Sequence, residues 1–117
     1  MPKTTKAHFK YFKKHVKKYM KKWKVTGWNV YFYWEDTEGN LAKYGADYRA
    51  GAASFAFGTK WKGVSVTKKR IKHAAKHEVG HLIVDPLYSL SLERCISRDE
   101  LDTADERLVN HLVELLP

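Results

Sequence analysis

The stretch His77-Glu78-Val79-Gly80-His81 decides how the fold of this chain is read, because its pattern H-E-x-x-H belongs on an α-helix. Side chains four positions apart project from the same face of a helix, so His77 and His81 can bind one zinc ion through their imidazole nitrogens. A zinc ion with three protein ligands keeps a position for water and lowers the pKa of that water to about 7, so a carboxylate beside the metal can accept its proton. Glu78 occupies that place. The pattern predicts attack on a peptide carbonyl, and the alternative is a solvated helix with two ordinary histidines.

The residues around this stretch predict an amphipathic helix. Thr67 can cap a helix that begins at Lys68, and Pro86 is expected to end it, because a proline pushes the residue before it, Asp85, out of helical geometry. The apolar positions on its predicted core face are Ile71, Ala75, Val79 and Leu82. One face of the helix should therefore pack in the core, and an adjoining face should carry the histidines.

Length and composition predict one domain over residues 1–117. The chain is long enough for a single modest core but not for two, and no apolar run approaches the roughly 20 residues needed to cross a bilayer. The first 24 residues are studded with lysine and lack the apolar segment of a secretory signal. A single cysteine, Cys95, fits a reducing compartment. We therefore expect a cytoplasmic protein without a membrane partner.

The net charge of +9 is spread unevenly along the chain. Residues 1–34 contain ten lysines and no acid, whereas residues 85–117 contain three bases and eight acids. Residues 4–24 predict a helix, because aromatic and other apolar residues recur at spacings of three and four and lysines fill the remaining positions. Its lysines form either a solvated face or a patch for nucleic acid or another polyanion. We favour the solvated face, because aromatic residues at helical spacing more often belong to a core.

Three stretches between these helices predict strands. Residues 28–34 are rich in β-favouring side chains, residues 41–50 contain a second strand, and residues 53–57 alternate as a half-buried strand does. We expect a mainly antiparallel sheet. Residues 53–57 are the candidate for an open edge to which an extended peptide substrate adds by main-chain hydrogen bonds, and the alternative is a core strand.

A tight zinc site needs a third ligand besides the two histidines. His73 lies about 12 Å from His81 along the helix axis, so one ion cannot easily be shared by both. The extended pattern H-E-x-x-H-x-x-G-x-x-H is absent, since Val84 and Leu87 stand where Gly and His are required. A later helix offers Glu106 near its start. The predicted buried face of that helix consists of Leu108, Val109, Leu112, Leu115 and Leu116.

Other roles for these carboxylates stay open on the sequence. Glu106 could instead close a capping box with Thr103. Glu93 and Glu100 are alternative ligands, because helix boundaries read from sequence shift by about two to four residues.

Residues 77–87 and 105–112 resemble the minimal gluzincin metallopeptidases, small one-domain proteins of archaea, phages and prophages. The order of helix, short sheet, motif helix and C-terminal helix is similar as well, so the resemblance spans most of the chain. If a phage encodes this protein, its compartment is the host cytoplasm.

The resemblance implies a Zn²⁺ ion held by His77, His81 and Glu106, with Glu78 as general base and acid. In gluzincins an acidic or amide residue one turn after the glutamate ligand can orient a ligand histidine, which places Asn110 in that role. The alternative for Asn110 is a solvent-facing residue. A zinc-bound imidazole needs such an acceptor on its other nitrogen.

A residue that stabilises the oxyanion is not evident from spacing, which departs from the larger gluzincins. Tyr88 and His111 are conceivable, but His111 lies five residues after Glu106 and is expected to point away. The resemblance also suggests latency, with the terminal residues 115–117 lying in the cleft.

Together these observations predict an α+β, zincin-like domain, with a small three-stranded, mainly antiparallel sheet packed on the motif helix and flanked by N- and C-terminal helices. The predicted function is zinc-dependent hydrolysis of a peptide or protein substrate. The alternative is a nucleic-acid-associated or non-catalytic interaction protein that uses the basic first helix and has a structural or vestigial metal site. SprT-like proteases, which are linked to DNA, use a third histidine soon after the motif, and residues 82–110 contain none.

Overall fold

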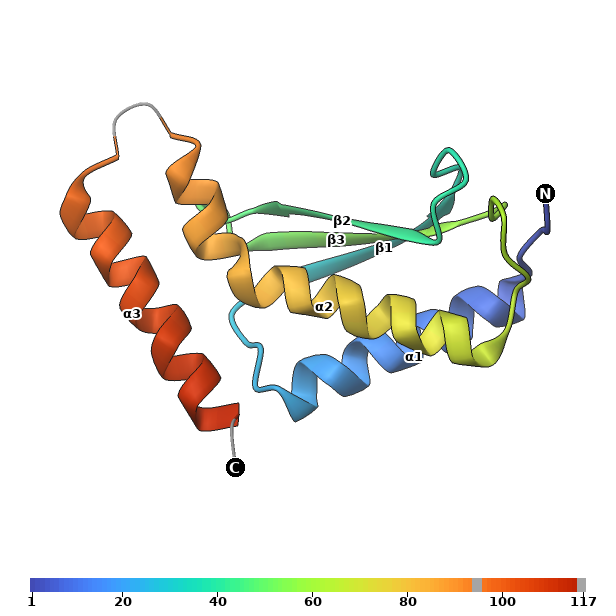
Figure 1. Ribbon diagram of the computed structural model, residues 1–117, viewed down its shortest axis with the longest axis horizontal. Helices are drawn as coiled ribbons and strands as arrows, with labels where there is room; N and C mark the ends of the chain where they lie inside the picture. The colour runs from blue at the N-terminus through green and yellow to red at the C-terminus, as the bar shows by residue number, and fades with distance from the viewer. Residues whose placement is uncertain (94–95, 116–117) are drawn as a thin grey trace.

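The computed structural model describes residues 1–93 and 96–115, which form three helices and one small sheet (Figure 1). In chain order the elements are α1 (Lys6–Lys22), β1 (Asn29–Glu35), β2 (Ala42–Asp47), β3 (Ala52–Gly58), α2 (Lys68–Ser91) and α3 (Arg98–Leu115). The predicted α+β class and order of elements are confirmed. Cys95, Leu116 and Pro117, on which the expectations about compartment and latency partly rested, lie outside the described residues. None of the described helices is long and apolar enough to cross a membrane.

The sheet is mixed, with the strand order β1-β3-β2. β1 runs parallel to β3, with Phe32 opposite Phe55, and β2 runs antiparallel to β3, with Tyr44 opposite Phe55. The expectation of a mainly antiparallel sheet is therefore wrong. Strands β2 and β3 form a hairpin, and β3 lies between β1 and β2. In this position β3 runs in the same direction as β1.

The central strand is β3, so the expectation that residues 53–57 form an open edge is also wrong. Ala53, Phe55 and Phe57 are buried, and a strand with such an apolar face is stabilised most where neighbours cover both of its edges. The free edges of the sheet belong to β1 and β2.

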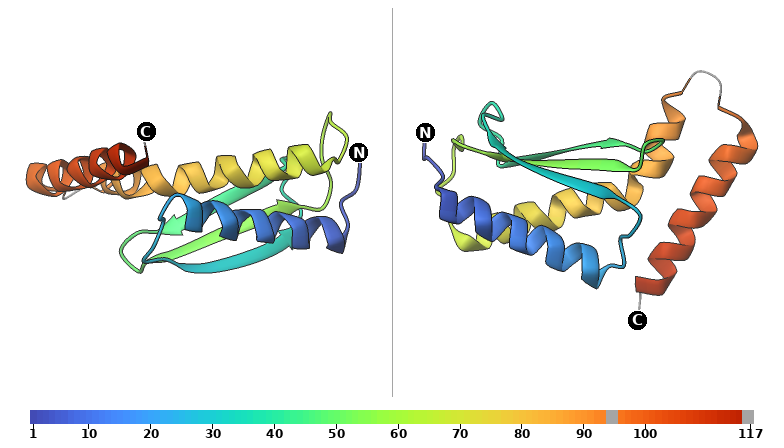
Figure 2. Two further views of the ribbon diagram at one scale, coloured as in Figure 1. Left: turned by 90° about the horizontal axis from the view of Figure 1, so that it is seen from below. Right: turned by 180° about the vertical axis from the view of Figure 1, so that it is seen from behind.

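Helices α1 and α2 lie side by side on one face of the sheet (Figure 2). Apolar side chains from all three layers form the core between them, and its fully buried members include Phe12, Val16, Phe55, Phe57, Trp61, Ile71, Val79 and Leu82. On the opposite face, Tyr31 and Tyr33 are about half exposed, and no described helix covers them. The amphipathic helices thus bury their apolar stripes against one side of the sheet.

Helix α2 begins as predicted and ends later than predicted. The Thr67 hydroxyl accepts a hydrogen bond from the Arg70 amide at 3.2 Å, which confirms the N-cap. Pro86 lies inside the helix, which continues to Ser91 and bends in these turns (Figure 1). Asp85 stays helical and is buried, because its carboxylate accepts hydrogen bonds from the hydroxyl of Tyr44 at 3.1 Å and of Ser89 at 2.8 Å. These bonds link the turns on either side of the proline and join them to β2.

Helix α3 packs beside the end of α2 through a face that differs from the predicted one. Ala104 is buried, and Leu108 is partly buried beside it. His111, which was expected to point away from the side of the helix that carries Glu106, contacts the carbonyl oxygen of Trp23 just after α1 through its Nε2. The predicted buried residues Val109 and Leu112 are 45% and 44% exposed. Contacts to a helix end and a loop, rather than to a broad apolar surface, decide which side of α3 faces inward.

Candidate metal centre

His77 and His81 form a pair of imidazoles in the middle of α2, both exposed on its surface. Their Nε2 atoms are 3.1 Å apart, and their rings cross at 80° with centroids separated by 4.7 Å. Two imidazoles on one tetrahedral zinc ion, each about 2.05 Å from the metal, place their nitrogens about 3.3 Å apart. The observed pair therefore fits a zinc ion as two of its ligands.

Glu78 is the buried polar residue of the motif, with 8% of its surface exposed. Burial raises the pKa of Glu78 to about 7, because removal from water disfavours the ionised carboxylate. A carboxyl group with a pKa near neutrality can both accept and release a proton at physiological pH. Glu78 is thus a buried carboxyl group that directly follows His77 in α2 and has a pKa near neutrality.

Tyr44 on β2 connects the imidazole pair to the sheet. Its ring stacks on His81 with centroids 4.9 Å apart and an interplanar angle of 7°, and its hydroxyl donates to Asp85. Burial, together with the neighbouring carboxylate of Asp85, raises the pKa of Tyr44 to about 12. Tyr44 therefore remains a neutral donor and fixes the position of His81 against the strand.

The sequence analysis missed Tyr44, Asp85 and Ser89. Asp85 and Ser89 continue the spacing of four residues that begins with His77 and His81, so they lie on the same side of the helix and this signal was available. Tyr44 offered no comparable signal, because its contact with His81 depends on how β2 is placed against α2.

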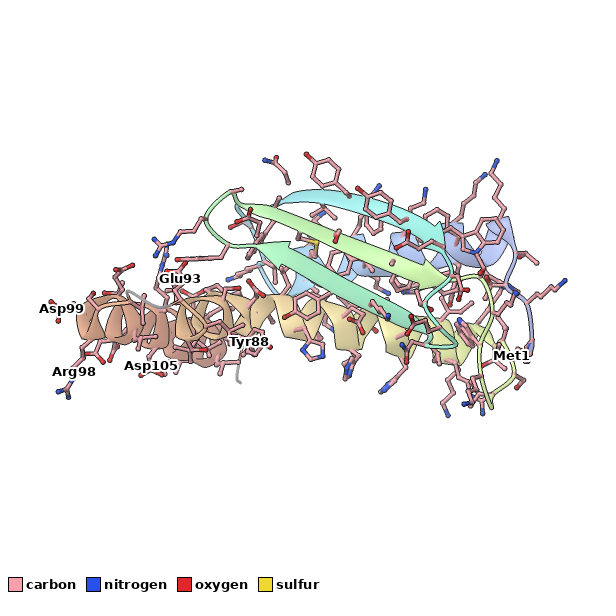
Figure 3. All side chains as sticks on the ribbon, turned by 90° about the horizontal axis from the view of Figure 1, so that it is seen from above. Met1, Tyr88, Glu93, Arg98, Asp99 and Asp105 are labelled. Atoms are coloured by element: carbon pink, nitrogen blue, oxygen red, sulfur yellow. The ribbon has the colours of Figure 1, made fainter. Side chains whose placement is uncertain are left out.

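A groove of about 600 Å³ begins at His81 and runs between β2 and the last turns of α2. The wall on α2 includes Val84, Tyr88 and Leu92, and the wall on β2 is formed by Tyr44 and two small residues. Tyr88, 56% exposed, projects from the end of α2 beyond the sheet (Figure 3). The groove thus offers an apolar surface next to the imidazole pair and the free edge of β2.

The described residues do not gather a third metal ligand around the histidines. No group of three or more His, Cys, Asp or Glu side chains that could hold a metal ion occurs within residues 1–93 and 96–115. Glu106 is exposed on α3 and does not lie on the inward side defined by Ala104 and Leu108. In this arrangement the structure brings together His77 and His81 but not Glu106.

Asn110 also lies apart from the imidazole pair. It lines a cavity of about 470 Å³ between α3 and the end of α2, which Ile83 and Pro86 border from the other side. None of the hydrogen bonds in the described part of the chain joins Asn110 to His77 or His81. The orienting role expected for Asn110 is therefore not present in this arrangement.

The alternative ligands Glu93 and Glu100 bind an arginine instead. The guanidinium of Arg49 lies 2.7 Å from Glu93 and 2.9 Å from Glu100, and it lowers the pKa of Glu93 through a hydrogen bond. These ion pairs tie the β2–β3 turn to the end of α2 and the start of α3. His73 is exposed one turn before His77, as expected for a surface residue.

Comparisons of the chain with known protein families, with curated proteins and with solved structures found no match.

Proposed function

We propose that this chain is a zincin-like metallopeptidase that hydrolyses peptide bonds with a Zn²⁺ ion at His77 and His81. The observation that carries the proposal is the approach of the two Nε2 atoms to 3.1 Å, with the buried Glu78 between them in sequence. Glu106 is the proposed third ligand, as the resemblance to the minimal gluzincins implies. When bound, zinc polarises the scissile carbonyl and makes a water molecule more acidic.

Glu78 carries out the proton transfers of the proposed reaction. With a pKa of about 7, its carboxylate accepts a proton from the attacking water, and the resulting acid returns a proton to the leaving amine. Tyr44 and Asp85 hold His81 in place through the stacked ring and the hydrogen bond at 3.1 Å. A ligand held in one rotamer before the metal arrives loses less conformational entropy on binding.

The free edge of β2 is the proposed binding site for the peptide backbone. The ladder of β2 is paired with β3 on one side only, and β2 contributes the tyrosine that stacks on His81. An extended peptide can add to such an edge by main-chain hydrogen bonds. The adjoining groove, with Val84, Tyr88 and Leu92 along it, favours a substrate with an apolar side chain.

Glu106 requires a movement of α3 to join the histidines. The packed face of the helix is small and includes Ala104 and Leu108, and a cavity of about 470 Å³ lies between α3, α2 and the segment that follows α1. Loose packing of this kind makes reorientation inexpensive compared with disruption of the main core. Zinc binding then stabilises the arrangement that supplies the third ligand.

Two measurements test the proposal. Elemental analysis should find about one zinc per chain in the wild type, a clear loss in Glu106→Gln, and no loss in the neighbouring control Asp105→Asn. Peptide hydrolysis should disappear in Glu78→Gln while zinc is retained. Zinc content that is unaffected by Glu106→Gln would remove Glu106 from the site, and activity retained in Glu78→Gln would contradict the mechanism.

The absence of a gathered third ligand among the described residues favours a second candidate, a non-catalytic interaction protein with a structural or vestigial metal site. Under that alternative the zinc-loaded wild type hydrolyses no peptide in a library of mixed sequences. Zinc content and peptide hydrolysis are measured separately. The proposed peptidase should both bind zinc and hydrolyse peptides, whereas the second candidate should not hydrolyse peptides even when zinc is bound.

A further inference from the structure

The outer surface of the two-helix layer carries lysines from both α1 and α2. Helix α1 contains eight lysines and no acid, and residues 68–76 at the start of α2 contain five basic residues and no acid. Exposed members of this set include Lys10, Lys14, Lys18, Lys21, Lys72 and Lys76, which we call the basic face. The sequence presents the two groups far apart along the chain, and the fold places their helices side by side (Figure 2).

His15 shows that the lysines of the two helices share one surface. This side chain is only 6% exposed, and burial lowers its pKa, as do the charges of Lys18, Lys72 and Lys14, in that order. Lys18 and Lys14 belong to α1, whereas Lys72 belongs to α2. In addition, the ammonium of Lys68 on α2 lies 5.7 Å from the ring centroid of Tyr11 on α1.

The charge of this surface is not neutralised within the described part of the chain. The ion pairs there involve Arg49 and Arg98 and none of the residues of the basic face. Six acids lie instead on α3, at the far end of the molecule, where Figure 3 labels Asp99 and Asp105. A field of one sign concentrated on one face attracts a polyanion, whereas a surface that serves solubility mixes both signs.

The aromatic residues of α1 and its C-cap Trp23 indicate which kind of polyanion the basic face can bind. Phe12 and Tyr19 are buried, and Phe9 and Trp23 pack against the same core, which confirms the interpretation of these residues as core. They are therefore not available to stack on unpaired bases, as proteins that bind single strands require. Lysines without accessible aromatic neighbours contact the phosphate backbone of a duplex and do not recognise its base sequence.

The shape of α1 favours B-form DNA. Lys10 and Lys21 lie about 17 Å apart along the helix axis, at about 1.5 Å per residue. An α-helix fits the B-DNA major groove, which is about 12 Å wide, but not the narrow, deep major groove of A-form RNA. We propose that the basic face binds the phosphate backbone of double-stranded DNA without sequence preference. This inference does not depend on the proposed peptidase activity.

Fluorescence anisotropy with a labelled 24-base-pair DNA and the full chain, without added metal, tests the proposal. The variant K14Q/K18Q/K72Q should bind at least about tenfold more weakly at 50 mM salt, and its log–log salt slope should be smaller by about 3, because each phosphate contact contributes about 0.9. The matched control K43Q/K60Q/K62Q removes the same charge from exposed lysines outside the basic face and should change affinity less than threefold. The pair K10Q/K21Q repeats the test on α1 in case the triple variant is unfolded.

Four results would overturn the proposal. These are absence of salt-dependent binding by the wild type, equal losses in the two triple variants, binding to duplex RNA as tight as to DNA, and tighter binding to vesicles that contain phosphatidylserine. Equal losses would show that net charge alone drives association. The last two results would assign the basic face to RNA or to a membrane surface.

Discussion

The ring of Tyr44 on β2 lies parallel to the imidazole of His81 on α2, with centroids 4.9 Å apart and planes 7° apart. The same tyrosine donates a hydrogen bond from its hydroxyl to Asp85, one helical turn beyond His81. A residue of the sheet therefore fixes both the histidine and the turn that follows it. This relationship joins the candidate metal centre to the edge strand that is the proposed peptide site.

Removal of the Tyr44 hydroxyl should weaken the site without dismantling the fold. Tyr44→Phe keeps the stacked ring but leaves one oxygen of the buried Asp85 without its partner, which costs about 1–3 kcal/mol of unfolding free energy. Zinc affinity should fall by up to about tenfold, because the support of His81 is weakened. Urea unfolding and zinc titration measure the two effects.

Tyr33→Phe is the matched control, since Tyr33 is 49% exposed on the open face of the sheet. It should change stability by less than about 0.5 kcal/mol. Equal effects in the two variants would show that the hydrogen bond from Tyr44 to Asp85 does not stabilise the site.

The raised pKa of Glu78 predicts that the metal-free protein loses stability as pH rises. Its pKa is 4.5 in the unfolded chain and about 7 in the folded protein, so the folded state holds the proton more tightly between these values. The stabilisation is fully present below pH 4.5 and is lost as pH rises through about 7, by up to about 3 kcal/mol at about 1.4 kcal/mol per pKa unit.

Glu78→Gln removes this titration. The variant should match the metal-free wild type at pH 4 and exceed it by up to about 3 kcal/mol at pH 8, as measured by urea unfolding with a chelator present. Glu114→Gln, on the exposed side of α3, is the control and should show no such difference. A stability gain that is the same at both pH values would contradict the assignment.

Two glycines should respond to alanine in opposite directions. A Cβ at Gly80 meets nothing within 4 Å, so Gly80→Ala should stabilise α2 by about 0.5–1 kcal/mol and leave zinc binding unchanged. A Cβ at Gly58 would lie 2.5 Å from the Thr37 hydroxyl and against the Asn40 carbonyl, so Gly58→Ala should destabilise by about 1–3 kcal/mol. Thermal unfolding shows whether each substitution stabilises or destabilises the protein. A destabilised Gly80→Ala would mean that another group lies close to Gly80, contrary to the structure.

The position of α3 can be tested with Val113→Ala, and Phe57→Ala in the main core serves as the reference for a fully buried side chain. Phe57 is fully buried and stacks on Phe12 with centroids 4.9 Å apart, so Phe57→Ala should cost about 3–5 kcal/mol. Val113 is 63% exposed, and Val113→Ala should change stability by less than about 0.5 kcal/mol. A cost above about 1.5 kcal/mol at Val113 in urea unfolding would mean that α3 buries this side of the helix in solution.

The sequence by itself determined the elements and the identity of the imidazole pair. Local signals are sufficient for these, because the cap at Thr67, the spacing of four between His77 and His81, and the alternation of the third strand act within a few residues of one another. The burial of the aromatic residues of α1 also followed from their periodicity. Asp85 and Ser89 continue the same spacing and could have been found in this way.

Only the tertiary structure decided how these elements meet. The central position of β3, the contact of Tyr44 with His81, the continuation of α2 past Pro86 and the inward side of α3 each depend on partners more than 20 residues away in the chain. Periodicity identifies an apolar face but not the surface that covers it, and pairing between distant segments is set by total burial rather than by local preference. The same reason applies to the basic face, since Lys14 and Lys72 share a surface only after α1 and α2 pack together.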